Sequence, residues 1–248
     1  MTPEQIEENV LTVKAEIARA AAEAGRDPAE ILLAAATKMN DAASVQAAIR
    51  AGVDICGENR VQEMLEKSAL GAYEGAPLHF IGHLQKNKVR QVVGRCALIH
   101  SVDSLPLLQE ISRTAEKRGL IQDVLLEINI GDEDSKSGFA PEEVAETLAK
   151  AAEFPAIRVR GLMAIPPVCE KPEENRPFFL KMRKLFVDNC GKKYDNISMD
   201  FLSMGMSGDY TEAIRCGANL VRVGTGIFGP RNYHTDTGHH DRTTEDQP

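Results

Sequence analysis

Eight short apolar segments, each followed by an amphipathic stretch, constrain the fold of this 248-residue chain most strongly. The apolar segments are rich in Val, Ile and Leu and lie at 31–37, 53–56, 78–82, 97–102, 122–130, 158–165, 198–203 and 219–223. The stretches between them, such as AASVQAAIRAG and SLPLLQEISRTAEKRG, often begin at a polar residue or proline and end at glycine, as helices do. A strand-then-helix unit repeated eight times without a long linker predicts an α/β fold, a single (β/α)8 TIM barrel.

An extra helix precedes the first predicted strand, from about Pro3 to Ala24, and ends at Gly25. The alternative fold is an open doubly wound sheet, which usually has a glycine-rich turn after its first strand. The first strand here is followed by TKMND, so we favour the barrel. We expect one domain over residues 1–233. The tail at 234–248, HTDTGHHDRTTEDQP, has no apolar periodicity and is predicted to be disordered.

Composition excludes several classes of function. The formal charge is −8, which argues against general binding to nucleic acids or anionic membranes. The N-terminus lacks the apolar core of a signal peptide, and no window is long and apolar enough for a membrane span. The five cysteines are scattered without a C-x-x-C pair, so neither zinc nor a disulfide framework is indicated. We therefore expect a cytoplasmic protein without nucleic-acid or membrane partners.

Candidate functional residues follow the predicted strands, where a TIM barrel carries its functional face. Lys38 directly follows the run LLAAAT, which is apolar up to Thr37. It is either a surface lysine or an amine held in an apolar pocket, where it can attack a carbonyl. Asn59 lies in GEN after the second strand, and His83 lies in GHLQ after the third.

The last two units carry a candidate phosphate site. LSMGMSGDYTEAI places Ser203, Gly205 and Ser207 before a helix, and LVRVGTGIFG places Gly224 and Thr225 after a strand. Glycine amides, hydroxyl groups and a helix N-terminus suit a phosphate, and TIM barrels often bind phosphate in the loops after strands seven and eight. Two glycine turns without a ligand are the alternative.

Arg222 lies inside the last apolar strand. If it points inward it needs an anion or a ring acceptor, and if it points outward it forms a salt bridge with a helix. Strands one and eight are neighbours in a closed barrel, so Lys38 and the phosphate loops would lie together. One ligand with an aldehyde and a phosphate, pyridoxal 5'-phosphate, suits this pairing. Arg222 would then keep the pyridine nitrogen unprotonated.

Several segments resemble the YggS/PROSC family of pyridoxal phosphate homeostasis proteins, which look like the barrel domain of alanine racemase. The matching segments are ATK at 36–38, GENRVQE at 57–63, HFIGHLQKNK at 79–88, SVDS at 101–104, EINIGDEDSKSG at 127–138, RGLMAIP at 160–166, LSMGMSGDYTEAI at 202–214 and VRVGTGIFGPRNY at 221–233. The resemblance covers most of the chain in the family's order.

The resemblance implies that Lys38 holds pyridoxal 5'-phosphate as a Schiff base and that Arg222 faces the pyridine nitrogen. Asn59 would lie near the cofactor, and Ser207, Gly224 and Thr225, with the loop at 203–206, would hold the phosphate. The predicted cofactor-binding residues are Lys38, Asn59, His83, Ser203, Met204, Met206, Ser207, Arg222, Gly224 and Thr225. Met39 and Arg60 depart from the family pattern, which often has threonine and tyrosine there.

The family is known for vitamin B6 balance, so we expect a monomeric reservoir or carrier that supplies pyridoxal-phosphate-dependent apoenzymes, without turnover, catalytic residues or a metal. Racemisation needs an acid–base group on each face of the substrate, and two-domain racemases take the second group from another domain. A weak racemase or other pyridoxal phosphate enzyme is the alternative. A barrel enzyme that acts on a phosphorylated sugar through a Lys38 Schiff base is a third reading.

Overall fold

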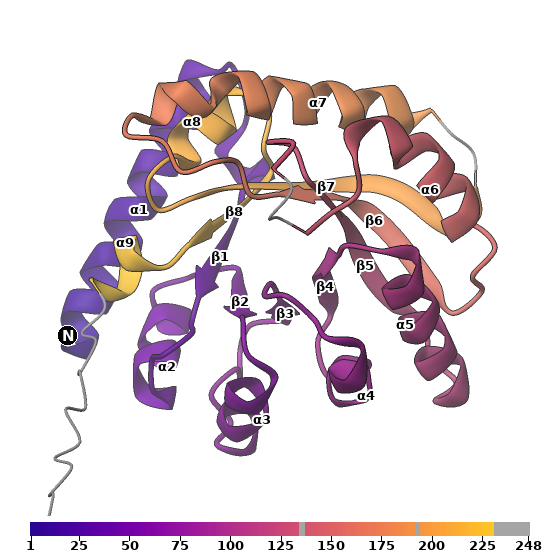
Figure 1. Ribbon diagram of the computed structural model, residues 1–248. Helices are drawn as coiled ribbons and strands as arrows, with labels where there is room; N and C mark the ends of the chain where they lie inside the picture. Colours follow the sequence, from indigo (N-terminus) through magenta and orange to yellow (C-terminus); the bar gives the residue numbers. More distant parts are fainter. Residues whose placement is uncertain (134–136, 192–193, 231–248) are drawn as a thin grey trace, which may run out of the picture.

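A closed barrel of eight parallel strands forms the centre of the computed structural model, which describes residues 1–133, 137–191 and 194–230 (Figure 1). The strands are β1 (Leu32–Ala36), β2 (Ile55–Glu58), β3 (Leu78–Phe80), β4 (Leu98–Val102), β5 (Gln122–Ile128), β6 (Ile157–Ala164), β7 (Ile197–Met206) and β8 (Leu220–Val223). Each strand pairs with the next, and β1 pairs with β8, where Ala34 lies opposite Arg222. The predicted TIM barrel is confirmed.

Helices surround the barrel and match the predicted amphipathic stretches (Figure 1). They are α1 (Pro3–Glu23), α2 (Ala42–Arg50), α3 (Val61–Ala69), α4 (Val89–Val92), α5 (Leu105–Lys117), α6 (Val144–Ala151), α7 (Arg176–Cys190), α8 (Tyr210–Arg215) and α9 (Thr225–Phe228), with short 3₁₀ turns at Pro28–Glu30, Lys86–Lys88, Pro141–Glu143 and Pro172–Asn175. None of the described helices is long and apolar enough to cross a membrane. The predicted disordered tail at 234–248, and the predicted domain end at 233, lie outside the described residues.

The extra helix α1 covers the seam where the barrel closes. A capping box between Thr2 and Gln5 begins it, with Pro3 in its first turn. Its buried positions recur at three- and four-residue intervals, from Ile6 to Ala21. It packs against α2, α8 and α9, and the Asn9 side-chain amide donates to the carbonyl of Ile227 at 2.9 Å. The first helix therefore fixes the segment that follows the last strand.

Two kinds of side chain fill the barrel. Small apolar clusters, one of Ala34, Ile55 and Leu220 and one of Leu98, Leu125 and Met163, are separate from the main core between strands and helices. Side chains alternate along a strand, so residues two positions further along face the same interior. These positions carry Arg222 and His100, both buried. The interior therefore gains buried polar side chains at the next level, toward the C-terminal ends of the strands.

Candidate functional site

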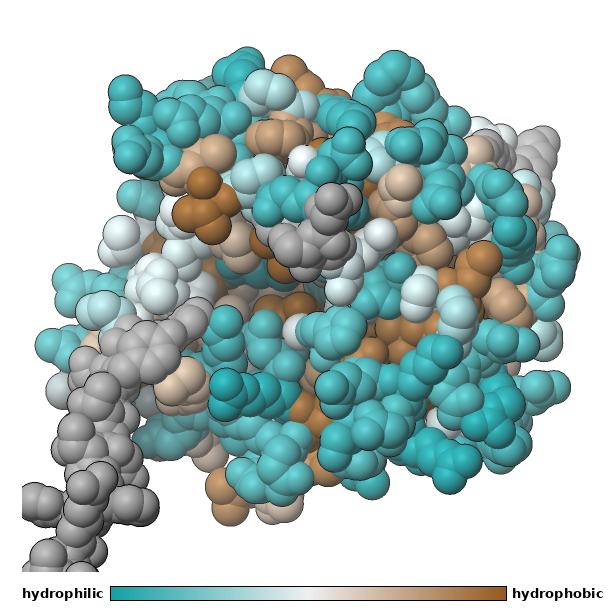
Figure 2. Space-filling view, in the orientation of Figure 1, coloured by the Kyte–Doolittle hydropathy of each residue, from teal (hydrophilic) through white to brown (hydrophobic). Residues whose placement is uncertain are grey.

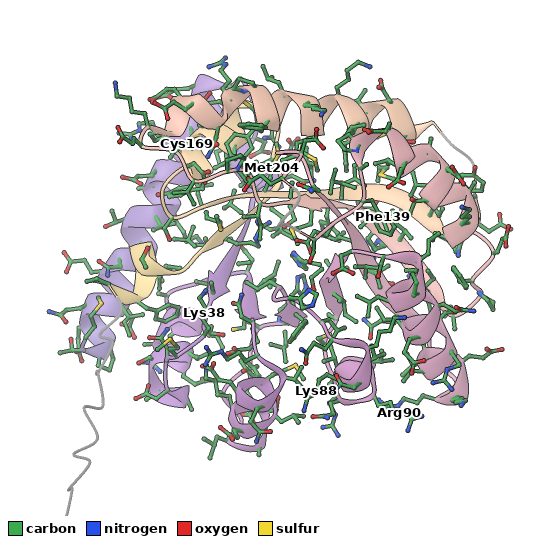
Figure 3. The ribbon with its side chains drawn as sticks, viewed as in Figure 1. Lys38, Lys88, Arg90, Phe139, Cys169 and Met204 are labelled. Atoms are coloured by element: carbon green, nitrogen blue, oxygen red, sulfur yellow. The ribbon has the colours of Figure 1, made fainter. Side chains whose placement is uncertain are left out.

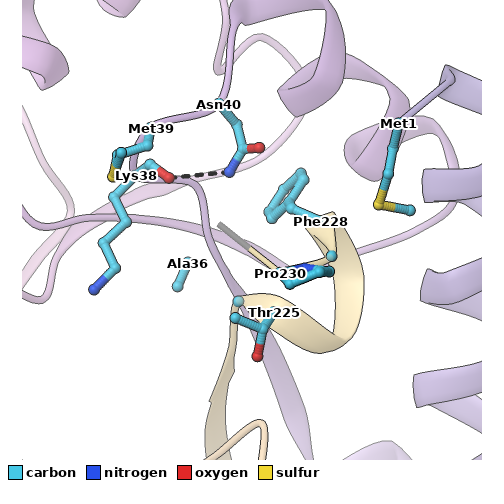
Figure 4. A pocket seen from close by; sticks show the side chains of 10 residues that line it. Met1, Ala36, Lys38, Met39, Asn40, Thr225, Phe228 and Pro230 are labelled. Atoms are coloured by element: carbon cyan, nitrogen blue, oxygen red, sulfur yellow. Dashed lines mark hydrogen bonds between the residues drawn. The ribbon is translucent and has the colours of Figure 1, made fainter. Parts of the chain in front are cut away.

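Lys38 lies in the turn that follows β1 and borders a cavity of about 370 Å³. Ala36, Gly224 and Thr225 also line this cavity, together with Phe228 of α9 (Figure 4). Lys38 is half-buried, and its carbonyl accepts from the side-chain amide of Asn40 at 3.0 Å. Figure 3 locates Lys38 on the ribbon, and Figure 2 shows the same face hollowed near its centre. Closure of β1 on β8 thus brings Lys38 to the glycine segment, as predicted.

Ser207 organises the start of the last helix. The backbone N–H groups of Gly224 and Gly226 donate to its hydroxyl oxygen at 3.0 and 3.3 Å. Thr225 is exposed between these two glycines and lines the cavity. Gly224 and Thr225 therefore bring a backbone segment and one hydroxyl group to the cavity that Lys38 borders, and Ser207 holds this segment in place. A hydroxyl donor beside a lysine amine suits an anion.

The segment at 203–206 differs from the predicted loop, because it belongs to β7. Met204 is fully buried in the main core, and the backbone N–H of Met206 donates to Asp209 Oδ1 at 2.7 Å. Ser203 is also fully buried and accepts from Arg222. Gly205, at φ +92°, lies where the register between β7 and β8 shifts, and it approaches Tyr210 and Ala213 of α8 too closely for any side chain. Ser207, rather than the residues before it, begins the loop.

Arg222 points into the barrel, which resolves the two orientations that the sequence left open. It is 4% exposed, and its guanidinium donates to Ser203 Oγ at 2.6 Å and to the carbonyl of Ala164 at 3.0 Å. Burial lowers the pKa of Arg222 to about 10, so it is still cationic at neutral pH. No salt bridge among the described residues includes Arg222, and the charges of Glu127 and Asp209 only partly offset the effect of its burial.

A chain of hydrogen bonds continues from Arg222 across the interior. Ser203 Oγ lies 3.0 Å from His100 Nδ1, and His100 Nε2 lies 2.9 Å from His79 Nδ1. Burial lowers the pKa of His79 to about 4, and burial with the nearby His79 lowers that of His100. Both imidazoles are therefore neutral at pH 7. The predicted site did not include this hydrogen-bond chain, although the polar residues within strands β3 and β4 were a signal for it.

A second cavity, of about 320 Å³, opens at the ends of other strands. Asn59, His83 and Glu127 line it. The side-chain oxygen of Asn59 is buried without a hydrogen-bond partner among the described residues. His83 Nδ1 lies 3.2 Å from a carboxylate oxygen of Asp103. Burial, together with the charge of Asp103, raises the pKa of Glu127 to about 7, against the influence of Arg222. Asn59 and His83 thus belong to this cavity rather than to the one that Lys38 borders.

A polar network lies under the Lys38 turn and was also absent from the predicted site. Glu58 is fully buried, and one of its oxygens accepts from Thr37, Lys67 and Tyr73. Burial and the carboxylate of Glu58 raise the pKa of Tyr73 and raise that of Cys56 to about 12, so neither gives up its proton at neutral pH. GENRVQE contains Glu58 and Glu63, but nothing in it links either residue to Lys38.

Chemically, the barrel mouth combines the amine of Lys38, the hydroxyl group of Thr225 and the buried guanidinium of Arg222. In the part of the chain that the structure describes, no three side chains of His, Cys, Asp and Glu gather closely enough to hold a metal ion. This combination suits covalent capture of a carbonyl compound that also carries an anionic group.

Comparison with known proteins adds three findings. Residues 5–232 match the family described as alanine racemase, N-terminal domain. Pyridoxal phosphate homeostasis proteins from Aquifex aeolicus and Escherichia coli are 41% and 42% identical to the chain, over 91% and 92% of it and 98% and 97% of their own lengths. The structure of PipY from Synechococcus elongatus with PLP bound has a TM-score of 0.77 at 30% identity, covering 90% of this chain and all of PipY.

Proposed function

Because this chain belongs to the family of pyridoxal phosphate homeostasis proteins, we propose that it binds pyridoxal 5'-phosphate and acts in intracellular vitamin B6 homeostasis. One observation supports this most directly. Lys38 from the first unit of the barrel and Gly224 and Thr225 from the last line one cavity. A lysine amine and a threonine hydroxyl group beside glycine in the same cavity suit a ligand with an aldehyde and a phosphate.

The residues present fit this cofactor by the chemistry of their donors and by the size of the cavity. About 370 Å³ falls in the range of small-molecule sites. Lys38 supplies the amine for covalent attachment, and pyridoxal phosphate, when bound, supplies the aldehyde and an electron-withdrawing ring. Gly224 and Thr225, which line the cavity, would hold the phosphate, and Ser207 would position them through its hydrogen bonds to the amides of Gly224 and Gly226.

Arg222 has a different part in the proposal. As a buried cation it would disfavour a proton on the pyridine nitrogen, because two positive charges in a low-dielectric interior repel strongly. An unprotonated ring withdraws electrons weakly. Arg222 would therefore favour storage of the cofactor over chemistry on an amino acid. Asn59 and His83, which line the second cavity, would contact only a part of the ligand that extends into that cavity.

A reservoir or carrier role follows if the site lacks a second acid–base group. Lys38 is the one side chain with an ionisable group among the described residues that line the first cavity. Apoenzymes that need pyridoxal phosphate would receive the cofactor. Weak turnover of amino acids is the second candidate, because Glu127 has a pKa of about 7 and lines the neighbouring cavity.

The test is the absorption spectrum of the purified protein before and after borohydride, beside Lys38→Ala. We expect a near-visible band that borohydride bleaches, with the cofactor left covalently on Lys38. The absence of any band after addition of pyridoxal phosphate would refute the proposal. Steady racemisation detected by chiral chromatography, and lost in both Lys38→Ala and Glu127→Gln, would establish the enzyme instead of the carrier.

A further inference from the structure

Helix α3 binds the peptide groups on both sides of Lys38. The carbonyl of Thr37, which belongs to the peptide bond before Lys38, accepts from Lys67 Nζ at 2.7 Å. The N–H of Met39, which belongs to the peptide bond after Lys38, donates to Glu63 Oε1. Lys67 and Glu63 are themselves paired at 2.7 Å. One ion pair on α3 therefore holds both peptide planes that flank Lys38.

The ammonium group of Lys67 has three partners in this arrangement. It is 6% exposed, and its ammonium group contacts Thr37, Glu58 and Glu63, each at 2.7 Å. An ammonium group has three protons, and a lysine this buried is rare unless all of them are paired. Glu58 also accepts from the Thr37 hydroxyl at 2.6 Å, which anchors the same residue a second time.

The held peptide planes fix the direction in which Lys38 leaves the backbone. A residue has two soft backbone torsions, and each one rotates a flanking peptide plane. With both planes bound to α3, neither torsion of Lys38 can change without breaking one of these two hydrogen bonds. Met39 has φ +62°, which is unusual for a residue with a side chain and persists only where surrounding contacts enforce it.

We propose that Lys67 and Glu63 are positioning residues that aim the Lys38 amine into its cavity. The inference rests on the proposed function, because it concerns attachment of pyridoxal phosphate to Lys38. Small displacements of a reacting group can lower a rate substantially even when the group itself is unchanged. Lys67 and Glu63 would act through the backbone of the turn without touching the cofactor.

The experiment measures the rate of attachment at saturating pyridoxal phosphate, from the near-visible band in stopped flow. We expect Lys67→Met and Glu63→Ala to attach roughly tenfold or more slowly than the wild type. Glu63→Gln keeps an oxygen that can accept from Met39, so it should be faster than Glu63→Ala. Tyr73→Phe is the matched control, because it removes a hydrogen bond to Glu58 at 3.0 Å but no contact with either peptide group.

A second measurement needs no cofactor and separates this inference from the proposed function. Hydrogen exchange at the Met39 amide should be at least tenfold faster in Glu63→Ala than in the wild type or Tyr73→Phe. Unchanged exchange, or attachment as fast in Glu63→Ala as in the wild type, would overturn the inference. An equal loss of rate in Tyr73→Phe would also overturn it.

If Lys67→Met fails to fold, the result for Glu63→Ala decides, because the side chain of Glu63 is more exposed than that of Lys67. A wild type with protected Met39 but no Lys38-dependent band would refute the function and leave the backbone anchoring intact.

Discussion

Replacing His79 with Asn should make the protein less sensitive to acid. His79 is buried beside His100 inside the barrel, and burial lowers its pKa to about 4. The folded protein therefore binds fewer protons than the unfolded chain between about pH 4 and the ordinary histidine value of 6.5. The stability that the neutral imidazole contributes is fully present above pH 6.5, and it is lost as the pH falls from 6.5 toward about 4.

The size of the effect follows from the two pKa values. With 6.5 for the unfolded chain and about 4 for the folded protein, the linkage relation gives a loss of about 2 kcal/mol between roughly pH 7 and pH 5. Glu127 changes the free energy of unfolding in the opposite direction. Its raised pKa of about 7 favours the folded state at acid pH, and this contribution disappears as the pH rises. Both the wild type and His79→Asn contain Glu127, so its contribution cancels when the pH dependence of the two proteins is compared.

Urea unfolding of the cofactor-free proteins, followed by far-ultraviolet circular dichroism, measures the difference. Asn can donate or accept toward His100, so the variant should keep the hydrogen bond that His79 makes. We expect the free energy of unfolding of the wild type to fall by about 2 kcal/mol more than that of His79→Asn over this range. An equal pH dependence of the two proteins would refute the reasoning that His79 is held neutral by burial.

Two further variants test the core and the candidate site. Phe80→Ala empties a fully buried position in β3, so the free energy of unfolding should fall by about 3–5 kcal/mol in urea titrations; a loss below about 1 kcal/mol would contradict the close packing there. Ser207→Ala removes the acceptor shared by Gly224 and Gly226, and fluorescence titration should show binding of pyridoxal phosphate weakened by roughly tenfold. Unchanged affinity would place the phosphate elsewhere.

The strands could be predicted because parallel strands are covered on both faces and appear as continuous apolar runs. All eight strands overlap the predicted segments, and the glycine after α1 marks its end as expected. The meeting of Lys38 with Gly224 followed from barrel closure alone. For these features the local pattern and the topology are sufficient.

Other features depend on contacts that no local pattern contains. The run SMGMS resembles a loop because Ser203 and Gly205 are small or polar, yet residues 203–206 belong to β7, where Ser203 accepts a hydrogen bond from Arg222 inside the barrel. Lys67 has an ordinary place on an amphipathic helix, and only its contact with Thr37 reveals its importance. Asn59 and His83 follow strands as predicted but line a different cavity.

The pairing of β1 with β8 also bears on synthesis of the chain at the ribosome. Lys38 emerges early, whereas Gly224 and Thr225, which complete its cavity, are among the last barrel residues to be translated. Contacts between residues so far apart in sequence close late in folding, after most local structure has formed. A nascent chain that ends before β8 has the lysine without the cavity, so the cavity is a property of the finished barrel only.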